Sequence, residues 1–354
     1  MSWPIQDFKP LQRSAAGFSM VEIMVSITIL SVILLATTAM IGQVNNVWRR
    51  TTGKMNAFQE SRAAFESLTR KLSQSTLNTY WDYNPPIGNP GGLVPTEYVR
   101  QSELHFVCGP AKELLNGVPA LTTTGHAVFF QAPLGYTVDS SSTQGRLDNL
   151  LNASGYFIQY SSDQDRRPNF IQAASGVLPK NRYRLMELWQ PSSELSVYAI
   201  NWDTVANPYD WFMEPVTQKQ GRAIASNIIA LVIQPGRSSG DTGGPLSSDF
   251  SYDSRRYLKS PANPFASLTR NQLPPVLNVT MVALDEDSAK RMDEKFGDTA
   301  PLLQADALFT EPDDLAKDLY VKEGGDTSLE AFLAENGYNY RIFVVDHHTS
   351  SQVE

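Results

Sequence analysis

The sequence predicts an α+β protein, in which one long N-terminal helix precedes a domain built mainly of antiparallel β-strands. No proline occurs between Pro10 and Pro85, which leaves a long stretch free to form an uninterrupted helix. Most of the 22 prolines and 22 glycines follow residue 84, where they separate short runs of β-branched and aromatic residues. The 354 residues suffice for one large domain or two modest ones.

The composition limits the classes of protein to which the chain can belong. With 42% apolar and 19% charged residues, the chain can form a core of ordinary size. The formal net charge of −8 argues against nucleic acid as the main partner, because phosphate binding requires clustered lysine and arginine. Cys108 is the one cysteine, so no disulfide forms within the chain. Its place at the end of a predicted strand favours a buried thiol over a reactive one.

The first element is an apolar run long enough to span a membrane. Every residue from Ile23 to Ile41 is apolar or a small serine or threonine. These 19 residues of helix extend about 28 Å, close to the thickness of a hydrocarbon core. A cleaved secretory signal peptide is the alternative. The run is too long for one, and no small-x-small cleavage site follows it.

The residues before the run have a specific order. Gly17 is followed by Phe18, then by Glu22, then by the apolar run. The stretch GFSMVEIMVSITIL resembles the class III signal of type IV pilins and pseudopilins. The resemblance implies that a prepilin peptidase cuts after Gly17, which removes residues 1–17, and then methylates the new amino terminus of Phe18. The helix-kinking proline that the family usually has later in the span is absent.

Glu22 is the only ionisable side chain between Phe18 and Val47. An ionised side chain in hydrocarbon is costly, so such a residue is by default a functional candidate. The pilin resemblance implies a role in assembly: the carboxylate pairs with the α-amine of Phe18 in a neighbouring subunit and fixes the register between helices. The alternative is that Glu22 only reaches toward the headgroups near the start of the helix.

Orientation in the membrane follows from the resemblance and not from charge. Arg49, Arg50 and Lys54 follow the span, which opposes a cytoplasmic amino terminus under the positive-inside rule. The pilin resemblance implies a single-pass protein of the bacterial inner membrane, with its C-terminal domain in the periplasm or at the exterior.

Beyond the span, apolar residues continue at helical spacing. They recur at steps of mostly three, four or seven, at Val44, Val47, Trp48, Met55, Phe58, Phe65, Leu68 and Leu72. Heptads with flanking charges are not sustained, which disfavours a coiled coil. We expect one helix over about 19–77. The pilin-like ladle then has a leader (1–17), a helix (18–78, membrane-spanning over 19–41) and a globular head (79–354).

The head is predicted as an antiparallel sheet laid on the amphipathic part of the helix. A loop at Tyr83–Gly92 ends the helix. Strands are expected at Glu103–Cys108, Ala127–Gln131, Tyr156–Ser161, Tyr183–Trp189, Ile228–Gln234, Leu277–Leu284 and Tyr338–Asp346. Helices are expected at Asp287–Phe296, Pro312–Val321 and Ser328–Glu335, the last capped by Thr327 or Ser328.

Two stretches of the head are similar to large minor pilins and to the J-type pseudopilin of type II secretion. RAIASNIIALVIQPG and NQLPPVLNVTMVALDEDSAKRM resemble paired strands of those proteins, separated by a variable loop. The chain length and the ending YNYRIFVVDHH resemble a narrower group, the pilin-like Verru_Chthon cassette protein C, whose function is unknown.

Two short motifs resemble those of hydrolases but lack the rest of a catalytic site. GDTGGP (Gly240–Pro245) has Thr242 where chymotrypsin-like proteases have serine, and the upstream histidine motif is missing. GRSSG (Gly236–Gly240) follows a predicted strand, but no helical sequence follows it. We therefore expect no catalytic residues and no enzyme activity.

No cofactor or metal site is expected. His347 and His348 are adjacent, so on a strand they point to opposite faces. The carboxylates of Leu284–Glu294 lack the spacing of a calcium loop and suit a solvated helix start. Calcium binding by the head stays open, because some pseudopilins bind calcium there. The sequence has no phosphate-binding glycine loop and no zinc motif.

Two functions remain. In the first, the chain is a structural minor pilin or pseudopilin that assembles through its helix into a type IV pilus-like or type II secretion-like fibre. Its partners are then other pilin or pseudopilin subunits, prepilin peptidase, the inner-membrane assembly platform and the lipid bilayer. In the second, the same helix anchors a fibre-tip adhesin or a substrate-binding module. The large head favours a minor or tip position over that of a repeated major subunit.

Overall fold

The structure is a computed structural model. It describes residues 19–84, 92, 94–137, 149–172, 176, 178–200, 207–237, 246–247, 249–259, 266–301 and 308–348. The chain divides into two compact units, Met1–Gly53 and Lys54–Glu354.

Helix α1 (Met20–Leu72) extends through 53 residues. The absence of proline from this stretch permits an unbroken helix. Its part from Met20 to Val44 has a mean hydropathy of 2.3 and is, by length and composition, able to cross a membrane. The helix ends at Leu72 and not near residue 77 as expected, because the chain then turns and the N–H of Thr76 donates to the carbonyl of Gln131 at 2.9 Å.

The largest sheet has six strands in the order β7-β6-β5-β4-β3-β9, and all neighbours are antiparallel. These strands are β3 (Val107–Pro110), β4 (Thr123–Pro133), β5 (Leu151–Ser162), β6 (Asn181–Gln190), β7 (Arg222–Ser226) and β9 (Tyr252–Asp253). Successive residues of β4 point to opposite faces, and both faces are buried, with Val128 in one core and Phe129 in the other.

The described part of the chain also forms two smaller sheets. The first has the antiparallel order β11-β10-β8 and consists of β8 (Ile228–Gly236), β10 (Val276–Leu284) and β11 (Tyr340–His348). The second is a hairpin of β1 (Tyr80–Asn84) and β2 (Glu97–Gln101). The pairing of β8 with β10 joins the two sequence stretches that were expected to form paired strands.

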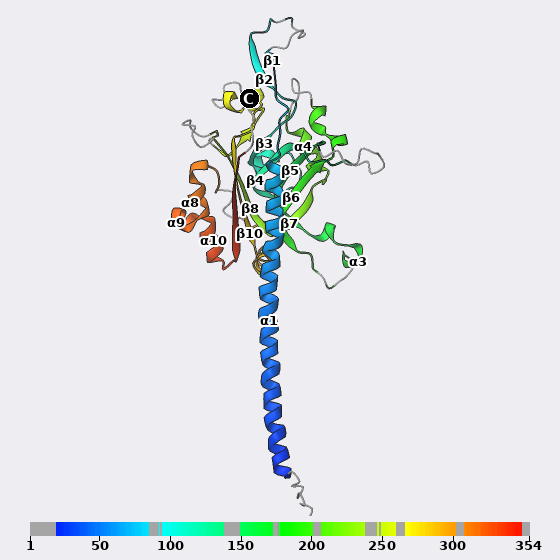
Figure 1. Ribbon diagram of the computed structural model, residues 1–354, viewed down its shortest axis with the longest axis vertical. Helices are drawn as coiled ribbons and strands as arrows, with labels where there is room; N and C mark the ends of the chain where they lie inside the picture. The colour runs from blue at the N-terminus through cyan, green and yellow to red at the C-terminus, as the bar shows by residue number, and fades with distance from the viewer. Residues whose placement is uncertain are drawn as a thin grey trace, which may run out of the picture. The chain divides into compact units, whose positions relative to one another are not determined.

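Short helices surround the sheets (Figure 1). They are α2 (Ala111–Leu114), α3 (Asn169–Gln172), α4 (Asp210–Thr217), α5 (Arg256–Lys259), α6 (Ala266–Thr269), α7 (Glu286–Phe296), α8 (Leu315–Leu319), α9 (Val321–Gly324) and α10 (Leu329–Glu335). The side chain of Ser328 accepts a hydrogen bond from the N–H of Ala331 at 3.2 Å, which confirms Ser328 as the cap of α10.

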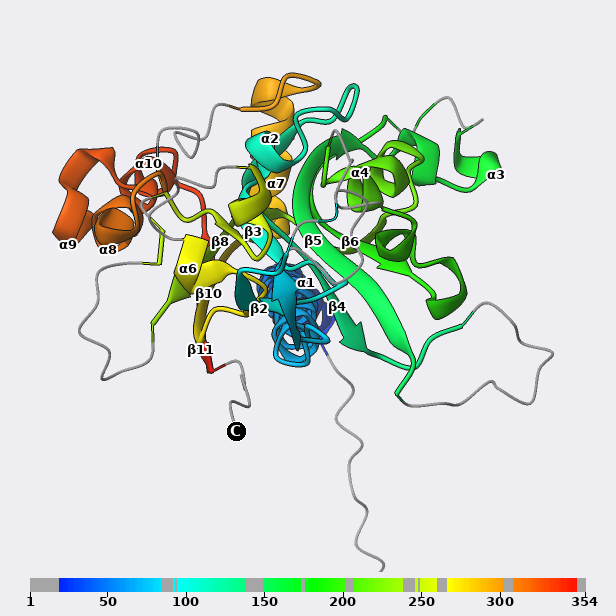
Figure 2. The same cartoon turned by 90° about the horizontal axis from the view of Figure 1, so that it is seen from above.

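The end of α1 packs between the six-stranded and three-stranded sheets (Figure 2). Phe65, Leu68 and Leu72 are buried there, in one core with side chains of both sheets. A second core covers the opposite face of the six-stranded sheet. In that core Phe129 stacks on Phe212 of α4, with 3.9 Å between the ring centroids.

The structure confirms the α+β class with an apolar N-terminal helix and antiparallel sheets, but several boundaries differ. Strand β3 begins at Val107 and not at Glu103, because the N–H groups of His105 and Phe106 bond to the side chains of Gln131 and Ser254 instead of a neighbouring strand.

The helix expected at Pro312–Val321 is interrupted. A 3₁₀ turn (Pro312–Asp314) precedes α8, and Tyr320 is extended, with φ −108° and ψ 139°. The N–H of Val321 is then free of the preceding turn and donates to Glu330 Oε2 at 3.0 Å. Strands β1, β2, β7 and β9 and helix α4 were not expected. The predicted loop Tyr83–Gly92 overlaps β1 at its start, and residues 85–91 lie outside the described part of the chain.

Candidate functional site

The apolar part of α1 presents its side chains outward. From Met20 to Val44 the large apolar side chains are between 49% and 82% exposed. Monomeric soluble proteins rarely expose an apolar surface of this extent, which marks an interaction with membrane or protein. The unit that contains this segment therefore has an interaction surface and no core of its own among the described residues.

Hydroxyl groups of the span are satisfied within the helix. Ser26 donates to the carbonyl oxygen of Glu22 at 2.7 Å. The other described hydroxyls of the span bond in the same way to carbonyls three or four residues earlier; they belong to Thr28, Ser31, Thr37 and Thr38. These side chains therefore bring no unpaired polar group into an apolar environment.

The carboxylate of Glu22 is the exception. It is exposed and makes no hydrogen bond or ion pair with any residue that the structure describes. Helical spacing places Glu22, Ser26 and Leu30 on one face, where together with Ile23 and Ile27 they line a shallow, open hollow. The span thus offers one charged group on an otherwise apolar surface.

The predicted cleavage position Gly17 and methylation position Phe18 lie outside the described residues. The comparison with known families covers them. Residues 12–38 match the family of the prokaryotic N-terminal methylation motif. The chain carries a type IV pilin-like signal. Gly17, Phe18 and Glu22 all fall within the matched residues.

The match supports a precursor of the type IV pilin or pseudopilin kind. It implies processing by prepilin peptidase and assembly with other pilin-type subunits. Together with the single apolar helix found in the described part of the chain, it fits a single-pass anchor in the inner membrane. No curated protein and no solved structure matches the chain.

Glu187 on β6 is bonded at both carboxylate oxygens to other side chains of the head. Lys71 Nζ lies 2.6 Å from its Oε1, and the Tyr156 hydroxyl donates to the same oxygen at 2.7 Å. The Nε of Arg222 donates to Oε2 at 2.7 Å. Burial alone would raise the pKa of Glu187, but the bonds from Lys71, Tyr156 and Arg222 outweigh burial and hold it below its usual value. Because Lys71 lies in the last turn of α1, this cluster fixes the helix to β6.

The head also contains a buried histidine–aspartate pair that the sequence did not indicate. His105 Nε2 lies 2.7 Å from Asp253 Oδ1, and the Tyr209 hydroxyl donates to Asp253 Oδ2 at 2.9 Å. The indole N–H of Trp211 donates to His105 Nδ1 at 3.1 Å. An indole can only donate, so Nδ1 accepts and the hydrogen on Nε2 points to the aspartate.

The surroundings of the His105–Asp253 pair indicate a structural role. His105 is fully buried, and each of its ring nitrogens already has a partner, in Asp253 and Trp211. Neither nitrogen is free to take a proton from a nucleophile, as a general base must. With Tyr209 and Trp211, the pair connects the segment just before β3 with the start of α4 and with β9, which are far apart in the sequence.

Three carboxylates near α7 are engaged by other groups of the protein. Asp285 caps α7 by accepting the N–H of Ser288 at 2.8 Å. Glu286 and Asp293 accept from Arg182 of β6 at 3.2 and 3.1 Å. Within the described residues, no group of three or more histidine, cysteine, aspartate or glutamate side chains is placed to hold a metal ion.

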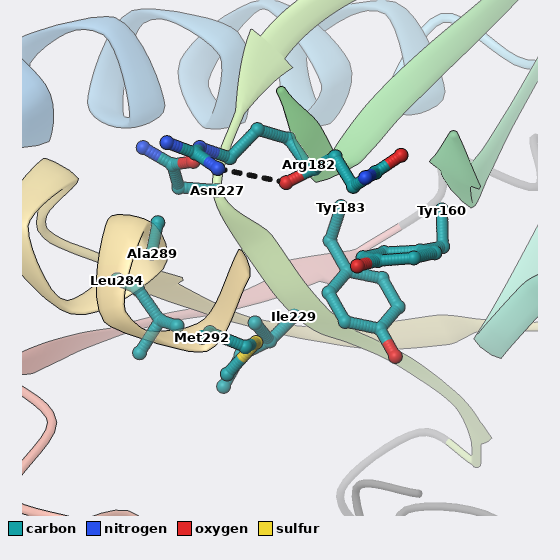
Figure 3. Close-up of a pocket in the computed structure, with 9 residues that line it drawn as sticks. Tyr160, Arg182, Tyr183, Asn227, Ile229, Leu284, Ala289 and Met292 are labelled. Atoms are coloured by element: carbon teal, nitrogen blue, oxygen red, sulfur yellow. Dashed lines mark hydrogen bonds between the residues drawn. The ribbon is translucent and has the colours of Figure 1, made fainter. Parts of the chain in front are cut away.

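Arg182 borders a small cavity between β6, β8 and α7, which Figure 3 shows with the guanidinium bonded to the carbonyl of Asn181. The cavity has a volume of about 10 Å³ and is lined by Tyr160, Tyr183 and Met292, among others. This is room for one water molecule at most, so the cavity is no site for a substrate.

The remaining sequence motifs add no site within the described part of the chain. GDTGGP, with Thr242, lies outside the described residues, as does GRSSG after Arg237. His347 and His348 end β11, where they pair with Leu277 and Val276. Cys108 is 1% exposed and its burial raises the pKa of the thiol, which confirms the expected buried, unreactive cysteine.

Proposed function

We propose that this protein is a structural subunit of a type IV pilus-like or type II secretion-like fibre, into which it assembles through α1. The observation that carries the proposal is the methylation motif in register with a single carboxylate on an apolar helix. A helix that exposes apolar side chains on all faces suits the membrane first and a bundle of similar helices afterwards.

Glu22 is the proposed assembly residue. A carboxylate in hydrocarbon is costly, and the described residues of the chain offer it no counter-ion. Cleavage after Gly17 would create a positive amine on Phe18, four residues from Glu22 in the sequence. Pairing between the Glu22 carboxylate of one subunit and the Phe18 amine of the next would neutralise both charges and fix the stagger between helices.

The head supports a minor or tip position in the fibre. Its described residues form two buried cores and three sheets, and so large a head favours this position over that of a repeated major subunit. In this proposal the head lies in the periplasm or at the cell exterior, and the inner-membrane assembly platform lifts the processed subunit out of the bilayer.

The mass of the mature protein tests the proposal. The full-length chain is produced in a bacterium that has an active prepilin peptidase and is extracted from membranes in detergent. We expect an intact mass that lacks residues 1–17, and an N-terminal peptide that carries one methyl group on Phe18. The same strain without the peptidase should give the full-length mass.

Two variants make this test specific. Gly17→Val places a branched side chain at the cleavage position and should leave the leader uncleaved. Met20→Leu, a substitution of similar volume in the same segment, should be processed normally. A native chain that keeps residues 1–17 beside a peptidase that cleaves a known substrate would contradict the proposal.

A further inference from the structure

Strand β11 forms an outer edge of the three-stranded sheet. It pairs with β10 from Tyr340 to His348 without a break in register, and it has no second neighbour among the described strands (Figure 2). A strand in this position presents a row of backbone N–H and C=O groups on its outer side. That outer side is therefore a place where a further strand can add to the sheet.

The hydrogen-bond pattern shows which backbone groups of β11 face outward. Next to the paired strands, the N–H of Asp285 donates to the carbonyl of Asn339 at 3.1 Å. Bonded and non-bonded pairs alternate along an antiparallel ladder, so the odd-numbered residues of β11 bond to β10. The backbone groups of Ile342, Val344 and Asp346 then point away from β10. No described residue bonds to these outward groups.

The other edges of the two larger sheets are short or engaged. On β8, at the opposite edge of the same sheet, the N–H of Ile233 donates to His126 Nδ1 at 3.0 Å. Strand β7 has five residues and an irregular register, and the N–H of Ser226 donates to Glu60 Oε1 at 3.0 Å. Strand β9 has two residues. Proteins protect their edges by such means, or with proline and lysine, whereas β11 is long and regular and contains neither.

The side chains of β11 indicate what kind of strand would fit beside it. Ile342–Val345 is an uninterrupted run of β-branched and aromatic residues, the types that favour strands, and Val344 is 55% exposed. Arg341 and Asp346 flank this run, are exposed, and form no ion pair with any described residue. An antiparallel partner would meet Asp346 near its start and Arg341 near its end. Charge therefore favours a segment that begins with a basic residue and ends with an acidic one.

A second copy of β11 does not suit this edge. Every strand pair in the described part of the chain is antiparallel, and this pairing is the more stable one per residue. Strand β11 runs along the last turns of α1 (Figure 1), where the ring centroids of Phe343 and Phe65 lie 5.7 Å apart. Antiparallel pairing of two copies would point their α1 helices in opposite directions. Subunits anchored in one membrane, as in the proposed function, do not have that arrangement.

We propose that the outer edge of β11 binds an extended segment of another protein, which adds to the sheet as a fourth, antiparallel strand. The segment has a basic residue, four apolar or β-branched residues and an acidic residue, in that order. Its backbone would bond to Ile342, Val344 and Asp346, which supplies affinity. Its two charged ends would pair with the side chains of Asp346 and Arg341, which fixes register and direction.

A short peptide tests the proposal. The probe is the labelled, end-blocked hexapeptide Lys-Val-Thr-Val-Thr-Glu, titrated with the full-length protein in detergent micelles and followed by fluorescence anisotropy. Its third and fifth residues lie opposite Val344 and Ile342, so methylation of their backbone nitrogens removes bonds to β11 and should abolish binding. Methylation of the second and fourth nitrogens, which point away from β11, should leave the affinity unchanged. The methylated pair also controls for uptake of the peptide by micelles.

Two substitutions at one position test the same edge from the side of the protein. Val344→Pro removes an outward N–H and no bond to β10, a position in which edge strands tolerate proline. It should weaken peptide binding by about tenfold, the size of one unmade hydrogen bond. Val344→Thr keeps the N–H and the branched side chain and should bind as the native protein does. Thermal unfolding of both variants shows whether a lost affinity is a lost fold.

Three results would overturn the proposal: no binding of the peptide at about millimolar concentration, equal binding of the two methylated peptides, or native affinity in a folded Val344→Pro. Self-association of the full-length protein that is lost in Val344→Pro, without any peptide binding, would also overturn it and would assign the edge to contacts between copies. Failure of this proposal leaves the cleavage of residues 1–17 unaffected, so it is distinguishable from failure of the proposed function.

Discussion

Two glutamates show how the span differs from the head. Glu22 sits on an apolar helix surface and has no partner among the described residues, whereas Glu187 is buried and accepts bonds from Lys71, Tyr156 and Arg222 at 2.6 to 2.7 Å. Charge is costly in both places unless it is paired. The head supplies its own partners for a buried carboxylate. The described residues of the span supply none for Glu22, which is why we propose that this carboxylate pairs with a second subunit.

The largest effect is expected where the head's pairing is broken. Glu187→Gln leaves Lys71, whose side chain is 10% exposed, without its counter-ion. Removal of one partner from a buried pair costs about 3–5 kcal/mol, so the free energy of unfolding should fall by that amount in thermal or urea unfolding. The matched control is Glu66→Gln on the same helix. It breaks an exposed pair with Arg62 and should cost no more than about 0.5 kcal/mol.

Similar losses of unfolding free energy in Glu187→Gln and Glu66→Gln would contradict the comparison. The buried carboxylate of the head would then contribute no more to stability than a surface carboxylate. The share of Glu187→Gln found in the membrane fraction should equal that of the native protein, because insertion should depend on Met20–Val44 alone. A changed share would contradict this independence of the span from the head.

A smaller effect is expected from acid. His126 is buried on β4, accepts the N–H of Ile233 at Nδ1 over 3.0 Å, and has Nε2 at 3.2 Å from the carbonyl of Phe309. Burial lowers its pKa to about 4. Between about pH 6.5 and 4 the unfolded chain binds a proton that the folded chain does not, so stability falls as pH falls, by about 3 kcal/mol in total.

The free energy of unfolding measured at pH 7, 5.5 and 4.5 checks this. His126→Gln removes the titrating group and should show a shallower decline than the native protein over the same range. Equal slopes would assign the acid sensitivity of the head to other groups. Glu187 is one of these groups, because its pKa is lowered in the folded protein. The stability that its ionised form contributes is lost as pH falls through the folded-state pKa.

The N-terminal methylation motif could be identified from the sequence because its signal is linear, whereas the polar clusters of the head could not. Gly17, Phe18 and Glu22 lie within six residues, and the apolar run directly follows them. The head's polar clusters join residues far apart in the sequence: Lys71 with Glu187, and His105 with Asp253. No spacing rule connects such positions before the fold is known.

Helix α4 shows why some elements were missed. Pro215 lies inside it, and proline normally argues against a helix because it removes an N–H and frees the carbonyl four residues earlier. That carbonyl belongs to Trp211, and it accepts bonds from the side chains of Gln190 at 3.1 Å and Ser196 at 3.2 Å. Tertiary partners thus replace the lost helical bond. Strand β1 was missed for a different reason, because the turn-forming residues that follow Tyr83 predicted a loop.

Within the span, the smallest effect is expected at Ser26. Its hydroxyl bonds to the carbonyl of Glu22 inside the helix, so Ser26→Ala removes no contact with another molecule. It lies one turn after Glu22 on the same face and is therefore the matched control for that residue. Membrane extraction and fibre incorporation of Ser26→Ala should equal those of the native protein.

Fibre incorporation of Glu22→Ala is the most direct measurement. Sheared or crosslinked fibres are quantified against the membrane pool, together with the processed mass and the melting temperature of the head. We predict that incorporation falls by at least about tenfold, the loss expected when one partner of an apolar ion pair is removed. Processing, insertion and head stability should not change. Normal incorporation of processed Glu22→Ala would contradict the role of this carboxylate in joining subunits.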